Sequence, residues 1–292
     1  METFISNSKL KKINEQFKKD TRKFKIILSL FLIVALILVC LIFLFIMQFN
    51  LDDIAIITFV VLILYVIFGL VGIVYFKQHF KSRFMLDEYA LELLALDGKT
   101  LTYIDKTLRR TLVRESIFIE KYDTLTVNKA YSFDIDGVSG KFFEVYASRS
   151  SGKSSYPVLE GILITLDKCS EERYNSFLKY NNYSKKGYYP HRVKEHKRLY
   201  LFTPKNENPV SIKDYSKVYQ RLLDLNICDN AGLYISTTKT EIIIKTKIKP
   251  IKIKKIDETT LKQTIAYYET FYNIIKKNIN FINELLDDSN VW

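Results

Sequence analysis

The chain has 292 residues, of which 48% are hydrophobic, and it carries 9 Gly, 5 Pro and a formal net charge of +12. So few Gly and Pro residues exclude a low-complexity or disordered chain, and the length suffices for one membrane unit and one soluble domain. Only ten of its 44 basic residues are Arg, the residue usually chosen for phosphate and base contacts, so we attribute the charge to a Lys-rich background composition and expect no nucleic-acid partner.

The cysteine and histidine residues give no sign of a disulfide framework or a metal site. Cys40, Cys169 and Cys228 are odd in number and widely spaced, which fits a reducing compartment. The chain contains no CxxC or HExxH motif, and His191 and His196 lie five residues apart, a poor ligand spacing on a helix. We therefore expect no metal ion and no cofactor.

Residues 1–25 form a basic amphipathic segment in which Leu10, Ile13, Phe17 and Phe24 recur at helical spacing among lysines. Two interpretations are open. The segment is either a helix lying on an anionic inner leaflet, where each nearby Lys or Arg contributes about 1 kcal/mol, or a solvated cytoplasmic tail.

Two apolar runs, 26–49 and 54–76, predict a transmembrane hairpin over residues 26–76, a block without Lys or Arg. At about 1.5 Å per residue, each run is long enough to cross a hydrocarbon core of ~30 Å. The first run is too long for the apolar region of a signal peptide and is followed by no small-residue cleavage site. A soluble protein of this size has no core large enough to bury both runs, so the hairpin is the better interpretation.

The charges that flank the hairpin predict its orientation, because basic residues are retained on the cytoplasmic side. Residues 1–25 hold eight basic side chains, whereas the connecting turn holds only the acids Asp52 and Asp53. We therefore expect a multi-pass protein of the cell (inner) membrane with both termini in the cytoplasm. The candidate lipid head-group contacts are the basic residues nearest the two outer flanks: Lys18, Lys19, Arg22, Lys23, Lys25, Lys77, Lys81 and Arg83.

Residues 77–98 predict a helical stem that prolongs the second membrane helix and ends at Asp97-Gly98. A stem of this kind holds the following domain at a set distance from the bilayer. Its apolar stripe consists of Phe80, Phe84, Leu91 and Leu94.

Residues 99–292 predict a cytoplasmic α+β domain with an antiparallel sheet and a long C-terminal helix. The sheet is expected to be antiparallel because no helix-length crossover separates its short β-type runs. These runs are 101–104, 116–119, 124–127, 131–135, 142–146 and 161–166, with a polar tip at 148–156. Residues 168–198 have no pattern that assigns a structure.

The second half of this domain continues with both types of element. A strand is expected at 200–202, a helix at 212–225 and a hairpin from 233–235 and 241–245. The alternating Lys/Ile stretch 245–255, interrupted by Pro250, is typical of a charged edge strand.

The last helix has an apolar stripe at heptad spacing, and two interpretations of it are open. The stripe either packs on the sheet of the same chain or drives self-association. Phe271, Ile274, Phe281 and Leu285 widen it beyond a strict coiled-coil seam, which favours packing on the sheet. The residues of this heptad stripe are Leu261, Ile265, Tyr268, Tyr272, Ile275, Ile279, Ile282 and Leu286.

Catalytic motifs are missing from the sequence: no GxSxG, P-loop, GxGxxG or kinase set occurs. Residues 150–155 resemble the end of a P-loop but lack its upstream Gly. Asp134 and Asp136 share a strand face and are expected to be solvated turn residues rather than a cation site. The cluster of Arg109, Arg110 and Arg114 could meet lipid head groups or an acidic partner.

Several short segments resemble an uncharacterised bacterial family of two-transmembrane proteins, some described as galanin-like and often encoded near LemA-type proteins. The likeness covers nearly the whole chain except residues 168–200, and its motifs are short and carry no chemistry. It implies a shared architecture and assigns no catalytic residue. The segments are Glu115-Ser-Ile-Phe118, Tyr122-Asp123, Asp136-Gly-Val-Ser-Gly140, Phe143-Glu-Val145, Leu159-Glu-Gly-Ile-Leu-Ile164, residues 222–225 and the closing Leu285 to Trp292.

Two functions follow from these observations as hypotheses. The first is a membrane-tethered cytoplasmic interaction domain that binds a membrane-associated protein partner or lipid head groups. The second is a membrane-bound hydrolase whose acidic residues converge from distant segments, for which a polar cleft gathering Asp134, Asp136 or Glu144 would be the evidence. Transport is a weaker third, because two helices without intramembrane charge offer no pathway.

Overall fold

The computed structural model describes twelve segments of the chain, which form two compact units. The first unit comprises Met1–Leu93 with Ile251–Ala266, and the second comprises Leu94–Pro250 with Tyr267–Trp292. Residues 251–266, which the sequence places in the domain 99–292, belong to the first of these compact units. The described segments are 6–47, 52–78, 81–119, 122–152, 154–168, 177–179, 187–193, 199–205, 215–228, 230–236, 238–245 and 253–287.

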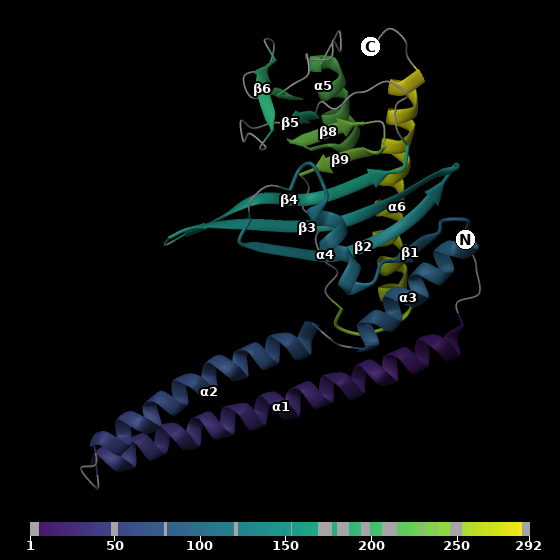
Figure 1. Ribbon diagram of the computed structural model, residues 1–292. Helices are drawn as coiled ribbons and strands as arrows, with labels where there is room; N and C mark the ends of the chain where they lie inside the picture. The colour runs from purple at the N-terminus through teal and green to yellow at the C-terminus, as the bar shows by residue number, and fades with distance from the viewer. Residues whose placement is uncertain are drawn as a thin grey trace. The chain divides into compact units, whose positions relative to one another are not determined.

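Two long apolar helices, α1 (Asn7–Met47) and α2 (Asp52–Gln78), lie antiparallel to one another in the first unit (Figure 1). Both are long and apolar enough to cross a membrane, and none of the apolar stretch of either is buried inside the protein. The basic segment and the first apolar run belong to one continuous helix of 41 residues. The predicted pair of long N-terminal helices is confirmed.

Three residues fix the contact between α1 and α2. The ring of Phe31 stacks on Tyr65 with centroids 4.9 Å apart, and the Tyr65 hydroxyl donates a hydrogen bond to the Phe31 carbonyl at 3.2 Å. The same ring lies over Gly69, where an added Cβ would stand 1.8 Å from it. The missing side chain of Gly69 is therefore what lets the two helices approach here, as small residues do in membrane helix pairs.

We predict that Gly69→Leu loosens this helix pair, because the leucine side chain needs the space that the Phe31 ring fills. Gly72→Leu is the matched control, since nothing lies within 4 Å of a Cβ added at Gly72. The measurement is the thermal melting temperature of each variant in detergent. Gly69→Leu should lower it and Gly72→Leu should leave it close to that of the unmodified chain; an equal effect of both would contradict the contact.

The N-terminal part of α1 packs against α3 (Lys81–Leu96), the helix that follows α2. The Ser6 amide donates to the Tyr89 hydroxyl at 2.8 Å, Lys9 forms an ion pair with Glu92, and the Ser82 amide donates to the Asp20 carboxylate at 3.4 Å. This packing against α3 is a contact that neither interpretation of residues 1–25 included. Leu10 and Ile13, offered by the sequence as a membrane-facing stripe, are buried.

The residues of the predicted stem contain the helix α3. The helix α2 ends at Gln78 and α3 begins at Lys81; residues 79–80, with the predicted stripe residue Phe80, lie outside the described chain. The predicted stop is correct, because Gly98 takes a φ of +74° and the Lys99 amide donates to the Leu94 carbonyl at 3.0 Å.

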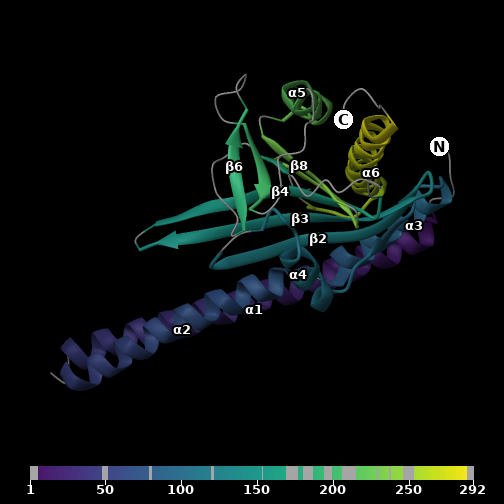
Figure 2. The ribbon, with the colours of Figure 1, turned by 45° about the horizontal axis from the view of Figure 1, so that its top comes forward.

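In the second unit the described residues form a nine-stranded sheet in the order β1-β2-β3-β4-β9-β8-β5-β7-β6, with every neighbouring pair antiparallel. The predicted antiparallel organisation is confirmed. Figure 2 shows β2, β3 and β4 as its long strands. The bounds are β1 Leu101–Tyr103, β2 Thr124–Ile135, β3 Val138–Ser151, β4 Ser154–Leu166, β5 Phe177–Lys179, β6 Tyr188–Arg192, β7 Tyr200–Pro204, β8 Ala231–Ile235 and β9 Thr240–Ile244.

The two runs predicted at 124–127 and 131–135 are a single strand, β2. Its pairing with β3 shifts between Val127 and Lys129, so there is a bulge at Asn128. The bulge interrupts the strand pattern, and for this reason the sequence predicted two strands in place of one. Beyond the bulge the register gives the sheet two apolar faces, because side chains alternate along each strand. One face carries Ala130, Phe143, Leu163 and Ile243, and the other carries Tyr131, Phe142, Ile164 and Ile242.

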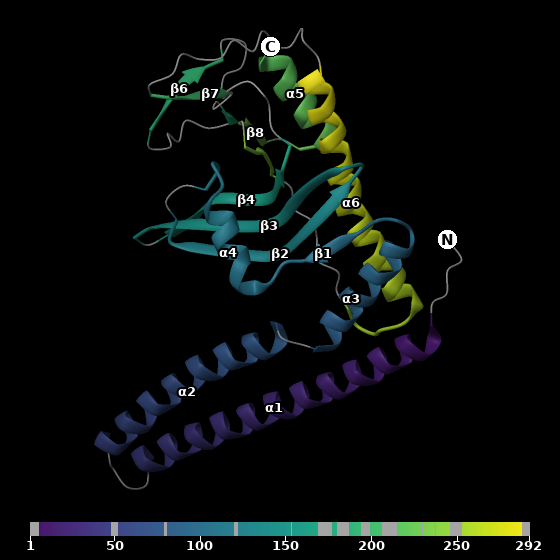
Figure 3. The same cartoon turned by 45° about the vertical axis from the view of Figure 1, so that its right-hand side comes forward.

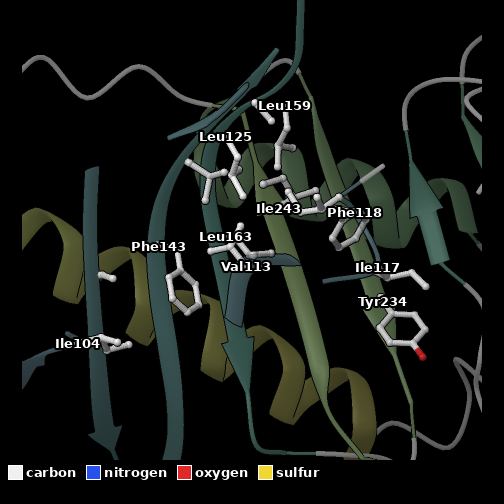
Figure 4. Close-up of a cluster of buried hydrophobic side chains, with 14 of the residues drawn as sticks. Ile104, Val113, Ile117, Phe118, Leu125, Phe143, Leu159, Leu163, Tyr234 and Ile243 are labelled. Atoms are coloured by element: carbon white, nitrogen blue, oxygen red, sulfur yellow. The ribbon is translucent and has the colours of Figure 1, made fainter. Parts of the chain in front are cut away.

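The first of these faces is covered by α4 (Lys106–Arg114) and the segment after it (Figure 4). Val113 of α4 and then Ile117 and Phe118 are buried against Phe143 and the residues beside it. The predicted strand at 116–119 is therefore wrong. Its apolar residues enter the core from the turn that follows α4. The helix α4 itself was not predicted from the sequence.

The opposite face is covered by the part of α6 (Glu258–Asp287) that belongs to the second unit, where Phe271 meets Phe142 with ring centroids 4.7 Å apart. The helix α5 (Tyr215–Asn226) lies beside this part of α6, and the side chains of Asn226 and Asn278 exchange two hydrogen bonds of 2.8 and 3.1 Å (Figure 3). Seven of the eight residues of the heptad stripe are buried, Leu286 being the partly exposed one. The stripe thus packs inside the chain, as its widened form indicated.

Some expectations fall partly or wholly outside the described residues. These are the assignments for Cys169 and His196, the start of the helix expected at 212–225, most of 168–198, and the central part of the edge strand at 245–255. The hairpin of β8 and β9 matches the strands predicted at 233–235 and 241–245.

Candidate functional site

Six of the eight predicted head-group contacts have described side chains, and all six are exposed. We call this set the basic collar. The side chains of the remaining two residues, Lys77 and Lys81, lie outside the described part of the chain. The basic collar consists of Lys18, Lys19, Arg22, Lys23 and Lys25 on α1 and Arg83 on α3.

The α1 residues of the basic collar occupy the outer surface of the helix. Lys18, Arg22 and Lys25 are spaced by four and three residues and form one row, and Lys19 with Lys23 forms the adjacent row. The spacing follows from the helix itself, because the apolar stripe of α1 is turned toward α3. The basic rows are left facing outward over about two turns.

The one acid within residues 18–25, Asp20, points the other way. It is buried and accepts hydrogen bonds from the Gln16 side chain at 2.8 Å and from the Ser82 amide at 3.4 Å. Ser82 lies in the first turn of α3, where a carboxylate is favoured by the helix dipole. Asp20 is therefore committed to holding α3 and does not neutralise the outward rows of the basic collar.

The basic collar adjoins the apolar stretch of α1 without a break in the helix. Lys25 is followed directly by Ile26 and Ile27, whose side chains are 50% and 42% exposed. A helix that passes in one step from exposed apolar to exposed basic side chains matches the boundary between hydrocarbon and head groups.

The acids proposed for a hydrolytic site do not gather. Asp134 accepts a hydrogen bond from Ser139 at 2.6 Å across the β2–β3 turn, and Asp136 in that turn forms an ion pair with Lys276 at 3.1 Å. Glu144 lies opposite Lys129, five residues further along the strand pair than Asp134, which is roughly 16 Å at 3.3 Å per residue. The positive φ of Asp136 fits its predicted role as a turn residue.

The three arginines near α4 have different surroundings. Arg109, one of the residues expected to meet lipid or an acidic partner, is only 4% exposed, so that expectation is wrong for it. Its Nε donates to the Ile104 carbonyl at 3.1 Å and its Nη1 to the Asn128 carbonyl at 3.3 Å, and its guanidinium lies 4.5 Å from the ring centre of Tyr103. Burial lowers the pKa of Arg109.

Arg109 therefore has a structural role that follows from the bulge in β2. The carbonyl of the bulged residue Asn128 has lost its place in the strand ladder, and Arg109 satisfies it. The sequence contains no signal for this, because the bulge appears only once β2 and β3 pair.

Arg110 and Arg114 are exposed on the outward side of α4, and so is Leu108, with 56% of its side chain accessible. The helix starts at Asp105, which accepts hydrogen bonds from the Thr107 hydroxyl at 2.6 Å and the Thr107 amide at 2.7 Å. These two bonds lower the pKa of Asp105, the hydroxyl bond contributing most.

A buried carboxylate in the same region was not predicted. Glu241 of β9 is 1% exposed and accepts from the Ile117 amide at 2.8 Å, from the Ser116 hydroxyl at 2.9 Å and from Lys239 at 2.6 Å. It ties the segment after α4 to β9. Its position at the start of a short apolar strand could not identify it, because an acid at the end of such a run is as often solvated as buried.

Among the residues that the structure describes, no group of three or more His, Cys, Asp or Glu side chains is arranged to hold a metal ion. The described surfaces that the geometry singles out are the basic collar and the outward side of α4.

No protein-family model matches the chain, and no curated protein matches it. Among solved structures, the crystal structure of the mycobacterial trehalose monomycolate transport factor A, TtfA, is similar with a TM-score of 0.28 and 8% sequence identity, over 66% of this chain and 95% of that one. A TM-score this low supports no conclusion about fold or function. The resemblance to the two-transmembrane bacterial family stays a prediction.

Proposed function

We propose that the protein is a membrane-anchored interaction module. In this proposal α1 and α2 span the cell membrane, both termini lie in the cytoplasm, the basic collar contacts anionic lipid head groups, and the sheet domain binds a protein partner. The observation that carries the proposal is the exposure of the apolar parts of α1 and α2.

The size of this exposed apolar surface supports lipid as its solvent. Twelve large apolar side chains on α1 and thirteen on α2 are exposed. At roughly 1.5–3 kcal/mol for each side chain left in water, the cost is several tens of kcal/mol. That is more than the 5–15 kcal/mol or so by which a native protein is stable, so a hairpin surrounded by water would not persist.

The basic collar supports the orientation and the head-group contact. Six exposed cations lie next to the apolar stretches, and the nearest acid, Asp20, is turned inward. Each cation near an anionic leaflet contributes about 1 kcal/mol, so the collar favours the negatively charged cytoplasmic side by several kcal/mol.

The test of the anchor uses two reporters that respond to opposite sides of the membrane. A fluorescent protein fused after Trp292 should fluoresce, and alkaline phosphatase at the same place should be inactive. The phosphatase inserted in the turn after Asn50 should be active. Changing the five α1 residues of the basic collar to Gln should give a mixed orientation, because these positive charges are the main difference in charge between the flanks of the hairpin and its turn. An active phosphatase after Trp292, or recovery of the chain in the aqueous fraction, would contradict the anchor.

The interaction role is proposed in preference to the hydrolase, because Asp134, Asp136 and Glu144 occupy separate places along the β2–β3 pair. A protein partner is best sought with photo-crosslinkers at exposed positions of the sheet domain, such as Tyr146, Tyr156, Tyr189 and Ile227. A discrete adduct from one position, absent from the others, supports the proposal. Absence of any adduct from all four in a folded protein would oppose it. Deletion of residues 257–292 is unsuitable, because α6 covers one face of the sheet.

A further inference from the structure

We infer that the outward side of α4 is a second membrane contact, which docks reversibly on anionic lipid. The inference rests on the anchor proposed above. It adds to it a surface on the second unit, separate from the basic collar.

Three exposed residues carry the inference: Leu108, Arg110 and Arg114. Arg110 and Arg114 are four residues apart and lie on one flank of the exposed part of α4, whereas Leu108 lies on the other flank. Cations that flank an exposed apolar side chain are found on helices that lie at a lipid interface, where the cations meet phosphates and the apolar chain enters the acyl boundary. The chain is rich in lysine, and α4 holds three of its ten arginines. Arginine is the residue that binds phosphate with two parallel hydrogen bonds.

The geometry of α4 prepares Arg114 for such a contact. Its Nε donates to the Tyr122 hydroxyl at 2.6 Å, and Tyr122 packs against the buried cluster under α4. The guanidinium is thereby held in place through one nitrogen, and its two Nη groups point away from that bond and can donate to phosphate oxygens. Less side-chain freedom is lost on binding than for an unrestrained arginine.

The inward side of α4 is fully used by the fold, so the outward side can change without loss of the helix. Arg109 and Val113 anchor it to the sheet, and Asp105 caps its start. Two carboxylates lie at its ends. Asp105 accepts hydrogen bonds from Thr107, whereas Glu115 at the C-terminal end is exposed, and its negative charge is repelled by an anionic surface.

The anchor supplies the lipid that this surface would bind. Lys106 follows the last residue of α3, Leu96, by ten residues. With α3 (16 residues, about 24 Å) and the two residues before it, the chain from the end of α2 to Lys106 reaches at most roughly 65 Å, so a tethered α4 stays near the bilayer at a raised effective concentration. Each arginine near the surface contributes roughly a fivefold factor to binding, which is too weak for a free domain and sufficient for a tethered one.

The test places a fluorescent reporter at Leu108 in the full chain, reconstituted in lipid nanodiscs. Trp292, the only tryptophan, is replaced by Phe, and Leu108→Trp is introduced at this exposed position. Brominated phosphatidylcholine in the discs quenches a tryptophan that enters the bilayer, and iodide quenches one that faces water. Discs with phosphatidylglycerol should give strong quenching by the brominated lipid, and discs of phosphatidylcholine alone should give quenching by iodide.

Charge variants make the test specific for α4. Arg110→Gln with Arg114→Gln should lower the docking equilibrium constant roughly 30-fold, and Glu115→Gln should raise it. Arg149→Gln with Arg192→Gln removes the same charge from exposed sites elsewhere on the sheet domain and should change nothing. Raising the salt concentration to 1 M should release the reporter, since the screening length falls to about 3 Å.

Iodide quenching that is the same with and without phosphatidylglycerol would overturn the inference. Protection from iodide without quenching by the brominated lipid would also overturn it, because another part of the protein would then cover α4. Failure of the anchor is distinguishable, since a chain that is not integral would be absent from the purified discs.

Discussion

Replacing Gly161 by Ala is expected to detach β9 from β4. Gly161 has a φ of +152°, and a Cβ added there would stand 2.0 Å from the Ile244 carbonyl oxygen. Because the neighbour is backbone, the clash can be relieved only by moving β9. The strained conformation alone costs roughly 1–3 kcal/mol, and displacement of the strand adds to it.

The measurement for Gly161→Ala is the thermal melting curve in detergent, followed by the near-ultraviolet circular dichroism of the tyrosines. We expect a loss of more than about 3 kcal/mol, which is a fall of roughly 6–12 °C for a domain of this size. Gly152→Ala is the control, because Gly152 also has a positive φ, +66°, but a Cβ there meets nothing within 4 Å. It should cost only about 1 kcal/mol. Equal losses for both variants would refute the close approach of β4 and β9.

Removing the carboxylate of Glu241 by mutation to Ala is the change with the second largest expected effect. Three donors converge on this side chain: the Ile117 amide, the Ser116 hydroxyl and Lys239. Without the carboxylate, the Ile117 amide and the Ser116 hydroxyl lose this acceptor, and the Lys239 ammonium group loses its counter-ion. Leaving the two buried donors without this acceptor costs about 1–3 kcal/mol each. Loss of the ion pair adds less than in a fully buried pair, because the Lys239 side chain is 29% exposed.

Glu115→Ala is the matched control for Glu241→Ala, since Glu115 lies on the same segment and its side chain is exposed. Its loss should stay within about 0.5 kcal/mol, as is usual at the surface. Hydrogen exchange at the Ile117 amide gives a second measurement. Glu241→Ala should abolish the protection of that amide, and unchanged protection would show that Glu241 is not its partner.

Proposals for the two exposed basic surfaces depend on different observations. The basic collar rests on its continuity with the apolar stretch of α1, whereas the outward side of α4 rests on two exposed arginines and an exposed leucine on its two flanks. If the chain is integral to the membrane but α4 does not dock on lipid, the first proposal stands and the second is wrong.

The sequence by itself determined the elements whose signal is local and repeated. Two uninterrupted apolar runs define α1 and α2, and two short apolar runs separated by a polar turn define the hairpin of β8 and β9. The 4-3 spacing from Leu261 to Leu286 defines α6. These patterns are visible in a single sequence because the period of a helix or strand is imposed by its own backbone.

Only the tertiary structure decided which surface each of these patterns faces. The stripe of Leu10 and Ile13 packs into the first unit, Arg109 is enclosed while Arg110 is exposed, and the apolar residues Ile117 and Phe118 enter the core from a turn. A periodic stripe shows that a face is apolar but not whether lipid, a sheet or a second helix covers it. That choice is made by segments distant in sequence, and it is why only the structure separates the enclosed Arg109 from the exposed Arg110 and Arg114 in the cluster that the sequence offered.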